Sequence, residues 1–206
     1  FDYSFMETLS YLIPCSIMIS SLQVYSQWSQ VKLYRFSVFY YLLPMVAIGL
    51  SLILYIPEIN LFLIIGVMLL LTSFVRLVPS LNEAISKILA DNFRAGLSII
   101  GLIHGLTNLG GAPLVAITNG IYNKKIKIQS NIAYAYLTMA LVQIIILVVT
   151  SEFVFNIVVL ILPFFSGLIY MIIGKYVFEN TNELFYKNLM TFFIFLYGVF
   201  IIFNSF

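Results

Sequence analysis

The chain has 206 residues, of which 62% are apolar and 9% are charged, and its net charge is +2 at pH 7. Soluble domains carry roughly a quarter charged residues, so this chain could not cover its surface with polar groups in water. Its single cysteine, Cys15, excludes an internal disulfide, and its single histidine, His104, excludes a metal or haem site made of several histidines. The composition indicates an integral membrane protein. We expect no metal, no cofactor and no nucleic-acid partner.

Long uninterrupted apolar runs such as LFLIIGVMLLL and LVQIIILVV predict helices that cross a bilayer. The fold class is therefore all-α, and the chain is predicted to be polytopic, with six spanning helices at 5–25, 36–56, 59–77, 128–150, 153–173 and 187–205. After the third span, PSLNEAISKILADNFRAG carries apolar residues at helical spacing among charged ones. This pattern predicts a short amphipathic helix that lies on the membrane surface.

The segment 95–121 differs from the spans because it contains GLIHGLTNLGGAPLVAI. Gly110 and Gly111 allow positive φ and a close approach of another group. Pro113 suits the first turn of a new helix, where its missing N–H would have no partner. The segment is therefore predicted to be a re-entrant hairpin of two half-helices, each about 20 Å long. The alternative is one crossing helix that is kinked at Gly110–Pro113.

The basic residues favour the hairpin. If 95–121 crossed the membrane, they would divide equally between the two faces, as Lys32, Arg35, Arg76, Lys87 and Arg94 on one and Lys124, Lys125, Lys127, Lys175 and Lys187 on the other. If it turns back, all 10 fall on one face, which identifies that face as cytoplasmic. The outer face would then carry the acidic residues Asp2, Glu7, Glu58 and Glu152.

Non-helical backbone at membrane depth occurs where it is buried in protein or lines a wet cavity. The second half-helix would begin with exposed N–H groups and a positive dipole end, which attract anions. Discontinuous helices of this kind hold the substrate in secondary transporters. The candidate substrate-binding residues are Thr107, Asn108, Gly110, Gly111 and Pro113. Gly101 and Gly105 belong either to this site or to a small-xxx-small helix contact.

Other polar residues within the spans are weaker candidates. His104 titrates near neutral pH, so it either couples transport to a proton or packs as a neutral side chain. Candidates for lining a cavity are Ser20 and Gln23 on the first helix and Asn131, Thr138 and Gln143 on 128–150. Each of these side chains could instead form a hydrogen bond between helices.

Three spans precede the hairpin and three follow it. Because three is odd, a second copy of the unit would be inserted upside down, as in the inverted repeats of transporters. The sequence therefore predicts two repeats, 1–94 and 95–206. The hairpin of the first repeat is missing, and its place would be ahead of Phe1.

Several stretches resemble a known family. GLIHGLTNLGGAPLVAITNGIYNKK and the following IQSNIAYAYLTMALVQIIILVV resemble the second half of the sulfite exporter TauE/SafE family. YLIPCSIMISSLQVYSQW, KLYRF and YYLLPMVAIGLSLIL resemble the helices after the first glycine-rich hairpin of that family. Asn108 and Ala112 stand where the family often has glycines. The resemblance implies alternating-access transport of sulfite, organosulfonates or related organosulfur and carboxylate anions across the plasma membrane.

An enzyme is not expected. Intramembrane proteolysis would need paired aspartates, a serine with a base, or a zinc site, whereas Asp2 and Asp91 are predicted on opposite faces. The predicted partners are a small anionic substrate, a coupling proton and the lipid bilayer. The alternative function is that of a membrane scaffold or channel subunit that does not itself transport.

Overall fold

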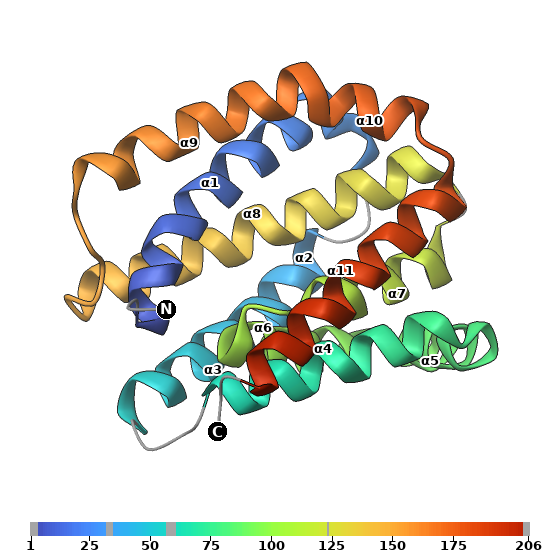
Figure 1. Ribbon diagram of the computed structural model, residues 1–206, viewed down its shortest axis with the longest axis horizontal. Coiled ribbons are helices and arrows are strands. Elements are labelled where there is room, and N and C mark those ends of the chain that lie inside the picture. The colour runs from blue at the N-terminus through green and yellow to red at the C-terminus, as the bar shows by residue number, and fades with distance from the viewer. Residues whose placement is uncertain (1–3, 32–34, 57–60, 123, 204–206) are drawn as a thin grey trace.

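The computed structural model describes residues 4–31, 35–56, 61–122 and 124–203 (Figure 1). These residues form helices and no strand, which confirms the all-α class. Asp2, Lys32 and Glu58, for which the sequence predicts a side of the membrane, lie outside the described residues. In chain order the helices are α1 (Phe5–Ser26), η1 (Trp28–Gln30), α2 (Arg35–Ser37), η2 (Val38–Leu42), α3 (Leu43–Tyr55), α4 (Leu61–Leu77), α5 (Pro79–Asp91), α6 (Phe93–Thr107), α7 (Gly111–Ile121), α8 (Lys125–Val149), α9 (Ile157–Ile169), η3 (Tyr170–Gly174), α10 (Lys175–Asn180) and α11 (Glu183–Phe203).

Four helices among the described residues are long and apolar enough to cross a membrane: Phe5–Ser26, Arg35–Tyr55, Lys125–Val149 and Ile157–Asn180. A fifth span is obtained if α4 and α5 are counted together, although their axes are bent by 107°. Within α11, the stretch Asn188–Phe203 is apolar but shorter than these four helices. These helices fit a membrane-embedded protein, while the count of six spans stays a prediction.

The largest boundary error concerns the predicted span 153–173. The helix begins only at Ile157 and continues through η3 and α10 to Asn180. The start is late because Asn156 adopts an extended conformation and its Oδ1 accepts a hydrogen bond from the Val159 N–H at 2.9 Å. Capping by this side chain therefore decides the boundary, although the residues before it are apolar enough to continue the helix.

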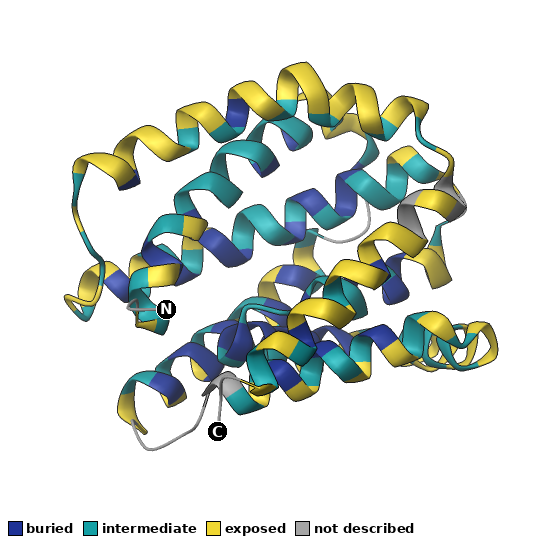
Figure 2. Cartoon of the chain, viewed as in Figure 1, coloured by how far each residue is buried: buried dark blue, intermediate teal, exposed yellow. Residues whose placement is uncertain are grey.

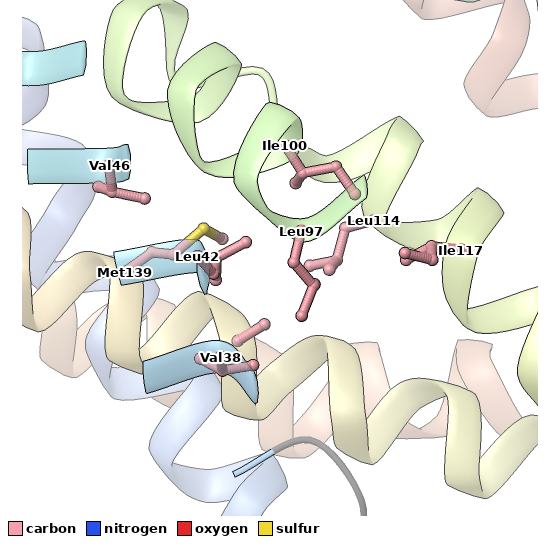
Figure 3. Close-up of a cluster of buried hydrophobic side chains, with 9 residues drawn as sticks. Val38, Leu42, Val46, Leu97, Ile100, Leu114, Ile117 and Met139 are labelled. Atoms are coloured by element: carbon pink, nitrogen blue, oxygen red, sulfur yellow. The ribbon is translucent and has the colours of Figure 1, made fainter. Parts of the chain in front are cut away.

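The helices pack in pairs that connect distant parts of the sequence. α1 packs against α8 and α9, α3 against α6 and α8, α4 against α11, and α5 against α7 (Figure 1). Burial concentrates on α3, α6 and α8, whereas α9 and α11 present mostly exposed residues (Figure 2). The main core joins η2 and α3 to α6, α7 and α8 (Figure 3), and its members are Val38, Leu42, Val46, Leu97, Ile100, Leu114, Ile117, Ala135 and Met139.

Three glycines bring α3 and α6 into backbone contact. A methyl group at Gly101 would collide with the Leu42 carbonyl oxygen, and one at Gly49 would lie 2.7 Å from the Leu102 carbonyl oxygen. A methyl group at Gly105 would lie 3.0 Å from the Gly49 Cα. Gly101 and Gly105 thus form a small-xxx-small helix contact, one of the two roles expected for them.

Two basic side chains lie at the end of the helix assembly where α6 and α8 begin. Lys125, in the first turn of α8, donates a hydrogen bond to the Phe178 carbonyl oxygen of α10 at 2.6 Å. Arg94, in the first turn of α6, lies 5.7 Å from the Tyr41 ring centroid. The opposite end holds the Val154 N–H, which donates to the Ser10 Oγ at 3.1 Å, and this contact joins the region after α8 to α1. The acidic residues Glu7 and Glu152 belong to that second end.

Candidate functional site

The chain between Phe93 and Ile121 reverses direction. α6 ends at Thr107 and α7 begins at Gly111. A methyl group at Gly96, near the start of α6, would lie 3.0 Å from the Ile117 Cδ1, near the end of α7. One continuous helix would separate these two positions by about 30 Å. The segment is therefore broken and folds back on itself, as predicted, while its re-entrant course in a membrane stays a prediction.

The start of α6 and the end of α7 both lie beside the same helix, α5. α6 follows α5 almost directly in the sequence, and a methyl group at Gly120 would lie 2.8 Å from the Ala90 Cβ and 2.9 Å from the Ser86 carbonyl oxygen. α5 is thus a helix, as its amphipathic pattern predicted, and it packs across the open end of the hairpin. The connections on either side of 95–121 therefore lie at one end of the helix assembly.

The reversal depends on Asn108 and not on a glycine. Asn108 adopts the left-handed conformation, with φ 59° and ψ 15°, and its N–H donates to the His104 carbonyl oxygen at 2.7 Å. Gly110 has φ −63°, and no glycine in the described part of the chain has positive φ, so the turn does not use the positive φ that Gly110 and Gly111 allow. Asparagine tolerates this conformation because its short polar side chain can form local hydrogen bonds. Pro113 lies in the first turn of α7, as predicted.

The two glycines of the turn are required for contacts within the protein. A methyl group at Gly110 would lie 2.7 Å from the His104 Cβ and 3.0 Å from its Nδ1. A methyl group at Gly111 would collide with the hydroxyl of Tyr136 on α8. Gly110 and Gly111 thus allow the close approach that was predicted, and the groups that approach are side chains of this chain.

The side chain of His104, in the last turn of α6, contacts the turn between α6 and α7. Its side chain is only 2% exposed, and its Nδ1 accepts a hydrogen bond from the Gly110 N–H at 3.3 Å. The imidazole meets the Tyr136 ring edge to face, with 5.7 Å between the ring centroids. Gln143 forms a hydrogen bond with the His104 side chain and also donates from Nε2 to the Asn108 Oδ1 at 3.5 Å. His104 therefore packs as a buried, hydrogen-bonded side chain, and its role in proton coupling is untested by these contacts.

The turn lies near the middle of α8. Tyr136, which contacts Gly111, is about 16 Å from the start of α8 at Lys125, and Gln143 is about 9 Å from its end at Val149. α8 is itself about 37 Å long, slightly more than the hydrocarbon thickness of a bilayer. The turn thus lies roughly halfway along the longest described helix.

The turn presents hydrogen-bond donors that the protein leaves unused. No side chain caps the start of α7, and the N–H groups of Gly111 and Ala112 make no hydrogen bond with the described residues. The Asn108 Nδ2 and the Tyr136 hydroxyl are likewise without a partner in the described part of the chain. No Lys or Arg occurs in the sequence between Arg94 and Lys124. These donors are neutral, and their positive potential comes from the N-terminus of α7.

Thr107 contributes mainly to the geometry of the turn. Its Oγ1 donates to the Ile103 carbonyl oxygen at 2.7 Å and accepts from the Leu109 N–H at 3.2 Å. This pair of hydrogen bonds closes the end of α6 on one side and supports the turn on the other. The Thr107 hydroxyl proton is therefore already used, and the donors available to a ligand come from the neighbouring residues.

The remaining predicted residues lie elsewhere. Ser20 is buried on α1, and Gln23 forms a hydrogen bond with Tyr170 of η3, in the region where α1 packs against α8 and α9. Asn131 is fully buried near the start of α8 and donates to the Lys127 carbonyl oxygen at 2.7 Å. Thr138 donates to the Tyr134 carbonyl oxygen of its own helix at 3.0 Å. None of these three hydrogen bonds joins its residue to the turn, and Ser20 is buried on α1.

Sequence reasoning missed Tyr136. The only signal is its spacing from Gln143, seven residues or almost two helical turns, which places both side chains on the same face of α8. Asn131 and Thr138 have the same spacing but lie on a different face, so the spacing alone does not distinguish the pair that contacts the hairpin. Comparisons of the chain with known protein families, with curated proteins and with solved structures found no match.

Proposed function

We propose that this protein is a membrane transporter for small anions, in which the α6–α7 hairpin enters and leaves the bilayer from the same face. The unused donors at the start of α7, halfway along α8, are the observation that supports this function best. The substrate site consists of Asn108, Gly110 and Gly111 with the Tyr136 hydroxyl, while Thr107 and Pro113 shape the turn.

Anion binding follows from the chemistry of these groups. The N-terminus of a helix carries the equivalent of about half a positive charge, and its free N–H groups point toward a ligand. Pro113 has no N–H, so the donors of the first turn are Gly111 and Ala112. In a low-dielectric environment, unpaired donors are costly, and an anion that accepts from them removes this cost. The absence of Lys and Arg between Arg94 and Lys124 favours anions of low charge.

The distribution of charge supports the orientation. The protein resides in the plasma membrane. If the hairpin is re-entrant, the loops that carry Arg35, Arg94 and Lys124 face the cytoplasm. The contacts of Arg94 with Tyr41 and of Lys125 with Phe178 match the basic and aromatic belts found where helices leave the hydrocarbon layer. α5 then lies at the cytoplasmic surface, bent away from α4.

Helix pairing supports two inverted repeats, 1–94 and 95–206, each with three spanning helices. The first helices of the repeats, α1 and α8, pack against each other, and so do the third helices, α4 and α11. The middle helix of each repeat packs against the first helix of the other, since α3 contacts α8 and α9 contacts α1. A two-fold axis in the membrane plane would produce these reciprocal contacts.

The class of substrate that we propose is inferred from the resemblance to the sulfite exporter TauE/SafE family. We propose sulfite, organosulfonates or related organosulfur and carboxylate anions, transported by alternating access across six spans. The hairpin turn belongs to the stretch that shows the resemblance, and its donors suit oxygen acceptors of such anions.

The topology is tested by cysteine labelling in a Cys15→Ser background. Cysteines at Lys87 and Lys124 should react with a membrane-impermeant thiol reagent from the cytoplasmic side, because α5 and the start of α8 lie at the same end. A cysteine at Glu152 is the control, and it should react from the opposite side. Reaction of the Lys87 and Lys124 positions from different sides would exclude a re-entrant hairpin.

The function is tested by anion uptake into liposomes that contain the purified chain. Asn108→Asp keeps a residue that tolerates the left-handed conformation and places a negative charge beside the donors. We expect it to reduce uptake of methanesulfonate or sulfite at least about tenfold, the effect of about 1.4 kcal/mol. Asn92→Asp at the start of α6, away from the turn, is the matched control and should transport normally. Unchanged uptake by Asn108→Asp would refute the site, and no uptake by the wild type would favour a scaffold or channel subunit.

A further inference from the structure

The contact between His104 and Gly110 has a consequence for anion binding. The Gly110 N–H is the first donor of the α7 N-terminus, and it is the one that the protein satisfies internally, through the His104 Nδ1 at 3.3 Å. A neutral imidazole that accepts at Nδ1 carries its proton on Nε2. The turn can keep this hydrogen bond only while Nδ1 remains unprotonated.

We propose that His104 is a proton-operated latch on the hairpin turn, and that a proton and an anion bind to the turn together. The inference rests on the proposed anion site. A proton that binds Nδ1 converts this nitrogen from an acceptor into a donor, so the Gly110 N–H loses its partner. The freed N–H joins those of Gly111 and Ala112, and the imidazolium adds a full positive charge beside them.

The helix ends around His104 favour this coupling. His104 lies in the last turn of α6, where the negative end of the helix dipole stabilises an imidazolium. Its Nδ1 also faces the N-terminus of α7, whose positive potential opposes a charge there until an anion arrives. Protonation alone is therefore disfavoured, and so is anion binding alone, whereas the two events stabilise each other.

The surroundings of His104 offer no competing charge. α8 presents Tyr136 and Gln143 to the imidazole, and α3 approaches this part of α6 through the backbone of Val46, Gly49 and Leu50. Among the described residues that face His104, Tyr136 is the one titratable side chain, and a phenol stays neutral where imidazole titrates. His104 is therefore the group through which a proton would act on the turn.

The test measures binding of methanesulfonate, which stays anionic throughout, to the purified full chain by thermal stabilisation at about pH 5 and about pH 8. The wild type should bind about tenfold more tightly at the lower pH and should take up a proton as it binds. His104→Asn places Oδ1 near the position of Nδ1, so it keeps an acceptor for Gly110 but cannot titrate. Its affinity should not change with pH. Tyr136→Phe, which removes a proposed donor of the site, should weaken binding at both pH values but keep the ratio between the two affinities.

Each outcome decides the proposal. The latch would be overturned if the wild type bound methanesulfonate with equal affinity at both pH values. It would also be overturned if the affinity of His104→Asn changed with pH as that of the wild type does. In either case the anion site would still stand. No binding of methanesulfonate or nitrate at either pH would remove the anion site and the latch together. If His104→Asn does not fold, proton uptake by the wild type decides the question, because binding without uptake excludes the latch.

Discussion

The contact between Gly111 and Tyr136 gives the sharpest test of the turn. In Gly111→Ala the new methyl group would collide with the Tyr136 hydroxyl, whereas the next nearest atom, Cζ, lies 3.4 Å away and is an ordinary contact. The Tyr136 ring is held in place by its edge-to-face contact with His104. Relief of the collision therefore requires either a shift of α7 or a movement of the ring.

A shift of α7 and a movement of the Tyr136 ring would each lower the free energy of unfolding. Overpacking a well-packed site typically costs about 1–3 kcal/mol, and loss of an aromatic contact costs about 0.5–1.5 kcal/mol. We expect Gly111→Ala to destabilise the protein by about 1–2 kcal/mol. Tyr136→Phe removes the colliding atom, so in that background Gly111→Ala should be neutral or stabilising by about 0.5 kcal/mol, since alanine favours a helix over glycine.

The measurement is a double-mutant cycle on apparent melting temperature in detergent, where 1 kcal/mol corresponds to about 2–4 °C for a chain of this size. Gly111→Ala should melt below the wild type, and the double variant with Tyr136→Phe should recover the loss. Tyr134→Phe, two residues away on α8, is the matched control and should not rescue Gly111→Ala. A double variant that melts as low as Gly111→Ala would show that the turn is not packed against Tyr136.

Three further features are tested by the same melting assay. Gly105→Leu should cost about 3 kcal/mol or more, because its side chain would force apart the backbones of α3 and α6; an unchanged melting temperature would disprove their close contact. Asn108→Ala should cost about 1–2 kcal/mol for its left-handed backbone while Asn108→Gly should be nearly neutral, so equal melting of the two would contradict that geometry. Asn156→Ala should cost at least about 1 kcal/mol, because it removes the cap of α9 and the hydrogen bond to the Tyr11 hydroxyl, and Asn180→Ala, whose side chain donates to a carbonyl of its own helix, should have little effect.

Parts of the site were readable in the sequence because they depend on local chemistry. The position of Pro113 in the first turn of α7 follows from the missing N–H of proline, and the break before it follows from the concentration of Gly110, Gly111 and Asn108. That Asn108 is the left-handed residue of the turn was not predicted. Any of these residues tolerates that conformation, and only the contacts of the glycines with His104 and Tyr136 determine that the glycines are needed elsewhere.

Some helix boundaries could likewise be predicted from the sequence, and others could not. The prediction for 5–25 agrees with α1 because its N-terminal capping box is local, formed between Ser4 and Glu7. The prediction for 153–173 failed because apolarity continues across Asn156, whose capping bond to Val159 begins the helix. Asn156 also donates to the Tyr11 hydroxyl of α1 at 2.7 Å, a contact that no local pattern indicates.

The amino-acid sequence alone determined that this chain is helical, apolar enough for a membrane and broken within 95–121, because composition, periodicity and backbone chemistry act over a few residues at a time. The tertiary structure decided which polar groups meet: Tyr136 and Gln143 reach the turn, while Ser20, Gln23, Asn131 and Thr138 contact other parts of the protein. That selection depends on how α8 is rotated against α6 and α7. The rotation is set by the contact of Gly111 with the Tyr136 side chain and by the shared apolar core, whose members lie far apart along the chain.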